Sequence, residues 1–325
     1  MPYPTLLVIK TSSLGDIIHM LPAISDARAH NPHLQIDWVV EEAFAEIPAW
    51  HPAVRRVLPV ALRRWRKQLS QRAIWAQLQA FRQQLQQQPY DWIVDTQGLL
   101  KSALLARQAR GQRWGYDWHS IREPLASLLY THTATISRQQ HAIRRNRQLM
   151  ANSLGYTLNE EMLNYGLTLA NFPVPTRILP QHYIVALHGT SRSDKEWGEA
   201  QWQQLLAELA VQGIHTLLPW GNERERVRAE RLAVANAWVQ VLPRSSLGEL
   251  AAILRQALAV IGLDTGLMHL AAALNKPCLA LYPVTQAGLT GLRANNPGGA
   301  PLITVAGEET QATLTIMQRF FNLLP

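Results

Sequence analysis

Short apolar runs alternate along the first half of the chain with longer segments whose apolar residues recur at helical spacing. Residues 6–9 form an apolar run of strand length, and residues 16–28 carry Ile17, Leu21 and Ile24 on one side of a predicted helix. The same alternation predicts further strands at residues 36–40, 57–60 and 92–94 and further helices at residues 71–88 and 99–107. Alternation of this kind predicts a parallel sheet covered by helices on both faces.

The alternation starts again after a proline-rich segment at residues 171–180, which we interpret as a linker. Strands are predicted at residues 183–187, 216–218, 239–241, 258–261 and 278–281, and helices at residues 199–211, 223–235, 247–256, 268–274 and 310–323. The sequence therefore predicts an α/β protein with two doubly wound domains, residues 1–172 and residues 173–325. Ligands of such domains bind at the carboxyl ends of the strands, so we expect a central ligand cleft there.

The composition narrows the class of protein. The 325 residues are enough for about two domains. Apolar residues make up 47% and charged residues 17% of the chain, which excludes a disordered or fibrous protein. A single cysteine excludes an intrachain disulfide and a cysteine metal cluster. There is no basic leader and no stretch of about 18 apolar residues, so we expect a protein that is cytosolic or peripheral on a membrane.

The net charge is positive and unevenly distributed. The chain has 31 Lys and Arg against 23 Asp and Glu, a net charge of +8. Residues 1–172 hold 19 basic and 12 acidic side chains, a net +7, whereas residues 173–325 hold 12 and 11, a net +1. A basic excess favours an anionic partner such as nucleic acid, a membrane surface or a phosphorylated substrate. The asymmetry indicates that the two halves bind different ligands.

Several common catalytic motifs are absent from the sequence. It has no G-x-G-x-x-G or G-x-x-x-x-G-K-[ST] nucleotide loop, no H-E-x-x-H or D-x-D metal motif, and no G-x-S-x-G nucleophile motif. The 11 histidines are scattered without the spacing of metal ligands. We therefore expect neither a protein-bound metal nor serine hydrolase chemistry.

The first candidate site lies between the first predicted strand and its helix, where α/β folds place ligands. The segment K-T-S-S-L-G-D ends at Asp16, which stands at the start of the helix. The ordinary structural explanation, favoured when this motif is taken alone, is that Asp16 caps the helix. The functional alternative is a carboxylate base that faces the cleft and is kept ionised by the helix N-terminus.

A second candidate site follows the last buried strand of the second half. There D-T-G-L-M-H opens a predicted helix. Backbone N–H groups at a helix start bind anions, so Asp264, Thr265 and Gly266 suit a pyrophosphate. His269 lies in the first turn, where ligand contact and simple packing are about equally expected.

Two more loops of the second half supply polar groups. The loop H-G-T-S-R-S-D-K-E-W offers hydroxyls at Thr190 and Ser191 and a phosphate-binding cation at Lys195; its alternative is a solvated turn. The loop P-W-G-N-E-R-E ends at Glu225, whose carboxylate suits ribose hydroxyls. Acids at a helix start are also ordinary, because they interact well with the helix dipole.

The basic excess of the first half is concentrated around one segment. R-R-W-R-K spans residues 63–67, and further cations stand at Arg55, Arg56, Arg72, Lys101 and Arg122. A charge run is usually solvated surface, but this one accounts for much of the excess. Arginine binds phosphate and carboxylate oxygens bidentately, so the segment is suited to a phosphorylated acceptor or anionic headgroups.

Taken in order, these segments resemble one family over most of the chain. The matching segments are K-T-S-S-L-G-D, V-V-E-E, R-R-W-R-K, D-T-Q-G-L-L-K-S, R-E-P-L-A-S-L, S-R-S-D-K-E-W, P-W-G and D-T-G-L-M-H-L-A-A-A. No single motif is decisive, but the ordered set is specific. It resembles the lipopolysaccharide heptosyltransferases of glycosyltransferase family 9, and within them the type that adds the first heptose to the Kdo region of lipid A.

The resemblance implies a GT-B fold, with two Rossmann-like domains facing a cleft, and an inverting transfer that needs no metal or other cofactor. It implies Asp16 as the catalytic base and an ADP-heptose donor held by the second half, at Thr190, Ser191, Lys195, Glu225, Asp264, Thr265, Gly266 and His269. It implies an anionic glycolipid acceptor, Kdo-lipid A, held by the first half at Arg63, Arg64, Lys67, Lys101 and Arg122. The expected location is the cytoplasmic face of the inner membrane, and the final helix of such proteins often crosses back onto the first domain.

Two segments depart from the family pattern. Ser191 stands where the family usually has threonine, and the exchange keeps the hydroxyl. Residues 283–287 are P-V-T-Q-A, where the family tends to have Gly-Pro-Thr, any residue and Pro. Pro283 removes an N–H that a glycine could donate near the donor, so the sequence leaves the identity of the donor sugar open.

Three alternatives remain at this stage. The first is a related transferase that adds a later heptose or another nucleotide-activated sugar to the same glycolipid. The second is a nucleic-acid-binding protein, although the sequence has no basic module with interleaved aromatic residues. The third is a catalytically silent binding protein, against which the presence of Asp16, Lys195 and Asp264 argues.

Overall fold

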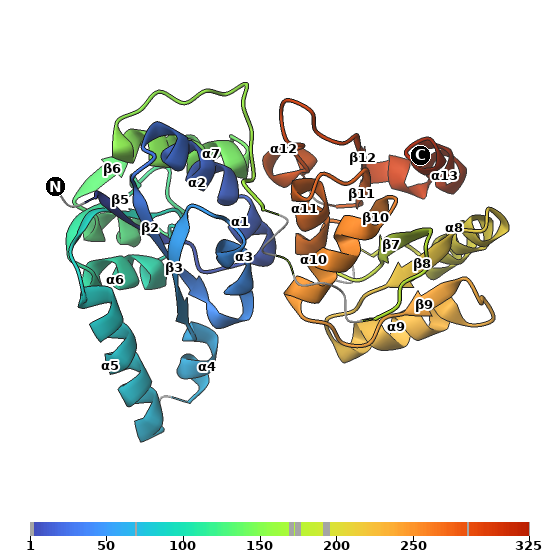
Figure 1. The fold of residues 1–325 in the computed structure, drawn as a ribbon, viewed down its shortest axis with the longest axis horizontal. Coiled ribbons are helices and arrows are strands. Elements are labelled where there is room, and N and C mark those ends of the chain that lie inside the picture. Colours follow the sequence, from blue (N-terminus) through green and yellow to red (C-terminus); the bar gives the residue numbers. More distant parts are fainter. Residues whose placement is uncertain are drawn as a thin grey trace. The chain divides into compact units, whose positions relative to one another are not determined.

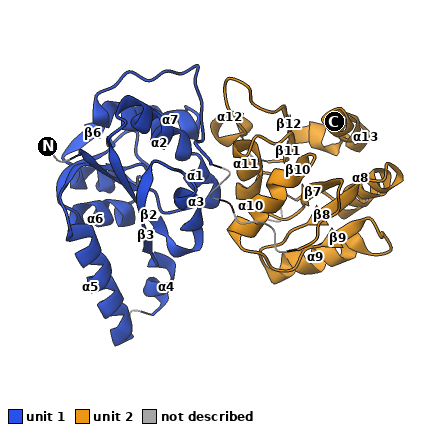
Figure 2. Ribbon diagram, in the orientation of Figure 1, with its two compact units in different colours: residues 1–168 blue, residues 169–325 orange. Residues whose placement is uncertain are grey.

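The computed structural model describes residues 3–68, 70–168, 172, 177–190, 196–284 and 286–324. The chain divides into two compact units, residues 1–168 and residues 169–325 (Figure 2). Each unit holds one six-stranded sheet in which every strand pairing is parallel. The two sheets confirm the predicted α/β class with two doubly wound units. Of the predicted linker, residues 171 and 173–176 lie outside the described residues.

The sheet of unit 1 has the strand order β3-β2-β1-β4-β5-β6 (Figure 1). Its strands are β1 (Thr5–Ile9), β2 (Gln35–Glu41), β3 (Val54–Val60), β4 (Tyr90–Asp95), β5 (Gly111–Tyr116) and β6 (His132–Ala134). The α-helices are α1 (Leu14–Ile18), α2 (Leu21–His30), α3 (Glu46–Ala49), α4 (Leu62–Lys67), α5 (Arg72–Gln86), α6 (Leu100–Gln108) and α7 (Ala142–Leu154), with short 3₁₀ helices η1 (Glu42–Phe44) and η2 (Pro124–Leu129). Residues 6–9 are completely buried, as expected for a strand covered on both faces.

The first predicted helix is divided in two. α1 ends at Ile18 and α2 begins at Leu21. The break has a local cause: Pro22, in the first turn of α2, has no N–H to donate to the carbonyl of Ile18. The single helix predicted at residues 16–28 is therefore wrong in its continuity and right in its position.

Unit 2 repeats the same topology with the strand order β12-β11-β10-β7-β8-β9. Its strands are β7 (Tyr183–Leu187), β8 (His215–Leu218), β9 (Val239–Val241), β10 (Val260–Leu263), β11 (Cys278–Tyr282) and β12 (Leu302–Ala306). Its helices are α8 (Glu199–Val211), α9 (Glu223–Ala233), α10 (Leu247–Gln256), α11 (Gly266–Ala273), α12 (Ala287–Thr290), η5 (Gly307–Gln311) and α13 (Thr313–Phe321).

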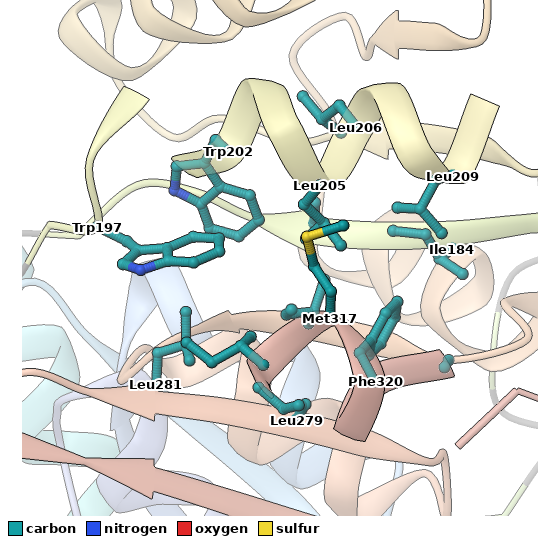
Figure 3. Close-up of a cluster of buried hydrophobic side chains, with 14 of the residues drawn as sticks. Ile184, Trp197, Trp202, Leu205, Leu206, Leu209, Leu279, Leu281, Met317 and Phe320 are labelled. Carbon is teal, nitrogen blue, oxygen red and sulfur yellow. The ribbon is translucent and has the colours of Figure 1, made fainter. Parts of the chain in front are cut away.

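The last helix packs within unit 2. Met317 and Phe320 of α13 belong to the buried core and lie between Leu205 of α8 and Leu279 of β11 (Figure 3). The ring of Trp197 packs edge-on against Trp202 in the same core, with 4.9 Å between ring centroids, and its indole N–H donates to the Thr310 carbonyl at 2.8 Å. These contacts anchor the C-terminal segment to the second sheet.

In both sheets the chain changes direction at the same point. Unit 1 builds β1, β2 and β3 outward on one side and then returns to place β4 on the other side of β1. Unit 2 does the same with β7 and β10. The carboxyl ends of two adjacent strands therefore diverge into different loops, and α/β folds bind ligands at this switch point. Among the described residues, none of the helices has the length and apolarity needed to span a bilayer.

Candidate active site

Asp16 lies at the switch point of unit 1, directly after β1. It is the third residue of α1, and Ser13 precedes that helix as its N-cap. One carboxylate oxygen of Asp16, Oδ2, accepts from the Ser13 backbone N–H at 2.8 Å and from the Ser13 hydroxyl at 3.0 Å. Asp16 thus does cap its helix, as the structural explanation requires. Within the described part of the chain, both hydrogen bonds to this carboxylate fall on Oδ2, which leaves Oδ1 for another donor.

The loop after β4 holds the loop after β1 in place. The side-chain oxygen of Gln97 accepts from the backbone N–H of Thr11 at 3.0 Å and of Ser12 at 3.1 Å. Gln97 itself is positioned by Asp95, whose Oδ1 accepts from the Gln97 N–H at 2.8 Å. Asp16 is therefore presented by a loop that is tied to the neighbouring strand.

Two opposite charges are buried beneath this loop. The Lys10 ammonium donates to the Thr96 carbonyl at 3.0 Å, and Asp95 accepts from the Tyr130 hydroxyl at 2.7 Å. Burial lowers the pKa of Lys10, which the negative charges of Asp16 and Asp95 oppose, and burial raises the pKa of Asp95. The negative charge of Asp95 favours the ionised form of Lys10, and the hydrogen bonds that Asp95 accepts from Tyr130 and from the Gln97 N–H oppose the effect of burial on its own pKa.

A second cation lies near the same strand ends. The Arg145 guanidinium stacks over the Tyr116 ring, 4.5 Å from its centroid, and donates to the Ser120 carbonyl at 2.8 Å. The charges of Arg145 and Arg122 further lower the pKa of Lys10. Sequence reasoning missed Lys10, Gln97 and Arg145 as members of the site. A buried position at a strand end could have indicated Lys10, but nothing local distinguishes Arg145 from its neighbours.

The predicted basic cluster lines a pocket of about 340 Å³. The pocket is lined by Glu41, Glu42, Ala43, Arg63, Arg64, Lys67 and Gln68. Arg64 donates to both Glu42 carboxylate oxygens, at 3.1 and 3.0 Å, and to Gln77 at 3.0 Å. The Arg63 guanidinium instead lies 5.7 Å from the centroid of the Phe44 ring.

The two arginines of this pocket therefore differ electrically. Among the described residues no carboxylate forms an ion pair with Arg63 or Lys67, whereas the charge of Arg64 is balanced by Glu42. The Arg64 hydrogen bond also lowers the pKa of Glu42. Two further predicted cations, Lys101 at the start of α6 and Arg122 before η2, are exposed.

The switch point of unit 2 carries the predicted pyrophosphate site. Asp264 follows β10, and Thr265 is the N-cap of α11, which begins at Gly266. The Asp264 carboxylate lies 3.6 Å from His269 Nε2. The Thr265 hydroxyl is buried and has no hydrogen-bond partner among the described residues. Asp264, Thr265, Gly266 and His269 are thus brought together at a helix start suited to an anion.

The loop after β7 lies against the first turn of α9. A Cβ at Gly189 would lie 2.7 Å from Glu225 Cγ, so a larger residue there would displace the Glu225 side chain. The Glu225 carboxylate accepts from the Gly221 N–H at 2.7 Å and from the Asn222 amide at 2.8 Å. The buried Thr190 follows Gly189 in this loop. Ser191 and Lys195 lie outside the described residues, as does Thr285 of the divergent loop at residues 283–287.

The structure therefore gathers the predicted residues into three groups. Asp16 stands at the strand ends of unit 1. In unit 2, Thr190, Glu225 and the Asp264 group follow β7, β8 and β10, which are consecutive strands of one sheet. Arg63, Arg64 and Lys67 form a separate basic pocket. In the part of the chain that the structure describes, no three His, Cys, Asp or Glu side chains are grouped closely enough to hold a metal ion.

Comparisons with known proteins identify the family of the chain. The sequence model of glycosyltransferase family 9 (heptosyltransferase) matches residues 78–316. The chain is 48% identical over 289 residues to lipopolysaccharide heptosyltransferase 1 of Escherichia coli strain K12, covering 88% of this chain and 89% of that protein.

Solved structures indicate the same family. The structure of E. coli heptosyltransferase WaaC with ADP superposes with a TM-score of 0.89 and 44% identity, covering 98% of this chain and 99% of that one. The structure of WaaC with ADP-2-deoxy-2-fluoro heptose superposes with a TM-score of 0.85 and 43% identity, with the same coverage of 98% and 99%. The family predicted from the sequence is confirmed, and the chain is a glycosyltransferase that belongs to family 9, the heptosyltransferases.

Proposed function

We propose that this heptosyltransferase attaches its sugar to the Kdo region of Kdo-lipid A, with inversion at the anomeric carbon and with Asp16 as the base. The reaction is heptose transfer from ADP-heptose, the activity of lipopolysaccharide heptosyltransferase I, whose E. coli representative is 48% identical. The observation that carries the base assignment is the geometry of Asp16: one oxygen is held by Ser13, and the other takes no hydrogen bond from the described residues.

The proton transfer follows from this geometry. Asp16 Oδ1 accepts the proton of an acceptor hydroxyl as that oxygen bonds to the anomeric carbon of the heptose. The bond between that carbon and the ADP oxygen breaks on the opposite face. The buried Lys10 ammonium lies close enough to act electrostatically on Asp16.

The leaving ADP carries the charge that unit 2 is suited to receive. The first backbone N–H groups of α11 point out of the helix start at Gly266, where they donate to diphosphate oxygens. The Thr265 hydroxyl, buried without a partner among the described residues, donates there as well. Lys195 and Ser191 would contribute a cation and a hydroxyl. Thr190, Asp264 and His269 complete the donor site, and the Glu225 carboxylate accepts from the ribose hydroxyls.

The acceptor is an anion, and unit 1 offers the cations to hold it. Arg63 and Lys67 have no carboxylate partner among the described residues, so their charges are available to Kdo carboxylates or lipid A phosphates. Arg64, Lys101 and Arg122 would join them. A glycolipid acceptor places the enzyme on the cytoplasmic face of the inner membrane, with an ADP-sugar and a glycolipid as its partners and no role for nucleic acid.

One incubation tests the whole assignment. The protein is incubated with Kdo-lipid A and a panel of nucleotide sugars, and the product mass is measured. We expect a heptose increment with ADP-heptose alone. A heptose increment on an already heptosylated acceptor, and none on Kdo-lipid A, would instead assign the chain to a later step.

A further inference from the structure

Two neighbouring elements of unit 1 leave four leucines exposed to solvent. Leu100 and Leu104 of α6 are 40% and 48% exposed, and Leu125 and Leu128 of η2 are 60% and 70% exposed. The α6 pair is separated by four residues and the η2 pair by three, so each pair lies on one face of its helix. We call these four side chains the leucine patch.

The two elements pack side by side near the carboxyl end of β4 (α6 is labelled in Figure 1). The Leu100 N–H donates to Glu123 Oε2 at 2.6 Å, and the Glu123 N–H donates to the Gly98 carbonyl at 3.2 Å. Ala103 and Ala126, on the inward faces of the two elements, are completely buried. The leucines are therefore the outward sides of two elements that share a common inner contact.

Exposed cations surround the leucine patch. Lys101 follows Leu100, Arg107 lies one turn after Leu104, and Arg122 stands three residues before Leu125. Within the described residues none of these cations forms an ion pair, and the Glu123 carboxylate is engaged by the start of α6. Apolar side chains flanked by unpaired cations are typical of surfaces that rest on anionic bilayers.

We propose that the leucine patch docks unit 1 on an anionic lipid bilayer. The leucines enter the boundary between headgroups and acyl chains, while Lys101, Arg107 and Arg122 lie among the lipid phosphates. The inference rests on the proposed function, because it takes the acceptor to be a membrane lipid, and it deepens that function by naming the surface that meets the membrane.

The position of the patch fits this use. Gly98, which accepts from Glu123 at the start of η2, is next to Gln97, whose side chain holds the loop that precedes Asp16. The patch is thus connected through one short loop to the residues that present the proposed base. A bilayer seated on the leucines holds its lipid phosphates at the same edge of the sheet as Asp16.

Flotation with vesicles tests the docking directly. The full chain and the double variant Leu125→Ser/Leu128→Ser are floated with vesicles of phosphatidylcholine and phosphatidylglycerol. Removing one inserted leucine weakens partitioning by about tenfold, so we expect the double variant to lose at least that factor. Leu314→Ser is the matched control, because Leu314 of α13 in unit 2 is 66% exposed and should leave flotation unchanged. Vesicles without phosphatidylglycerol should bind the parent chain more weakly.

Turnover on two acceptors separates docking from catalysis. The double variant should transfer heptose slowly to an acceptor embedded in vesicles and at the parent rate to a deacylated, water-soluble acceptor. A parent chain that floats but transfers to neither acceptor overturns the proposed function and leaves the docking surface standing. Equal flotation of parent and double variant overturns the docking proposal. So does a parent dimer that the double variant converts to a monomer, because a second copy would then cover the patch.

Discussion

The two units share one strand topology, but the groups at their strand ends differ: charged side chains in unit 1, and a helix start with a buried hydroxyl in unit 2. In unit 1 the switch point between β1 and β4 buries charged side chains, Lys10 and Asp95, beneath the proposed base. In unit 2 the switch point between β7 and β10 offers a helix start, a buried hydroxyl at Thr265 and the backbone of Gly266. The fold supplies the place, and the few residues after each strand supply the chemistry.

The charges of the two units are also arranged differently. In unit 2 the arginines of α9 are paired: Arg228 lies 2.7 Å from Glu196, and Arg231 lies 2.5 Å from Glu199. In unit 1 some arginines are paired too, since Asp37 binds both Arg55 and Arg56, but Arg63, Lys67 and the cations around the leucine patch are not paired within the described residues. Part of the net +7 of the first half is therefore carried by cations that have no ion-pair partner among the described residues.

The largest effect is expected when the proposed base, Asp16, is replaced. Asp16→Asn keeps an oxygen that can accept from Ser13 and so keeps the helix cap, but it removes the proton acceptor. We expect its turnover to fall by about 10² to 10⁴, with ADP affinity and melting temperature close to those of the parent. Asp16→Ala should lose the same turnover and also lower the melting temperature. Near-parent turnover in Asp16→Asn would show that Asp16 only caps its helix.

The next largest effect is the dependence of each unit's stability on pH, which one buried histidine in each unit controls. Burial lowers the pKa of His51 in unit 1 and of His188 in unit 2 from 6.5 to about 4. The unfolded chain therefore takes up these protons first, and stability is lost as pH falls from 6.5 toward 4. At pH 5 the loss is about 2 kcal/mol for each histidine.

Denaturant unfolding at pH 7 and pH 5 measures this loss. His51→Gln should flatten the pH dependence of unit 1 alone, and His188→Gln that of unit 2 alone. An unchanged dependence in both variants would mean that other groups, such as the paired carboxylates, carry the acid sensitivity.

A smaller effect is expected at the donor site, where Glu225 is replaced to test its part in ADP binding. Glu225→Gln replaces a charged acceptor with a neutral one, and we expect ADP affinity to fall by about tenfold. Glu223→Gln is the matched control, because Glu223 lies in the same helical turn but pairs with Arg226 at the surface. Calorimetric titration with ADP measures both. Equal losses in the two variants would point to the helix start as a whole rather than to Glu225.

The smallest effect separates two adjacent arginines of unit 1. Arg63→Ala should raise the KM for the glycolipid acceptor by about fivefold, since one cation near an anionic surface contributes about 1 kcal/mol. Arg64→Ala should raise it less, because Glu42 already balances that charge. The KM for the donor should stay unchanged in both. An equal or larger effect of Arg64→Ala would assign the acceptor contact to Arg64.

Much of the fold was predictable because its central strands are buried on both faces. Strands β1, β7 and β11 can be predicted from the local sequence alone, since a strand between two helical layers must be continuously apolar. Strands β5, β6 and β12 and helices α3, α4, α7 and α12 were not predicted. β5 has the sequence Gly-Gln-Arg-Trp-Gly-Tyr, which shows no clear period. Its pairing with β4 makes it a strand. A Cβ at Gly111 would lie 2.0 Å from the Tyr90 carbonyl oxygen, so this pairing requires a glycine.

The sequence by itself determined the family, the two-unit architecture and the loops that carry the candidate chemistry, because short motifs and strand periodicity are local properties. Only the tertiary structure decided which charged side chains are partnered by other residues of the chain. Arg63 and Arg64 are adjacent and alike in the sequence, yet Glu42, 22 residues before Arg64, binds only Arg64. Arg145 joins the strand ends through Tyr116, which is 29 residues away in the chain. Such pairings depend on where the folded backbone places distant side chains, and no local pattern contains that information.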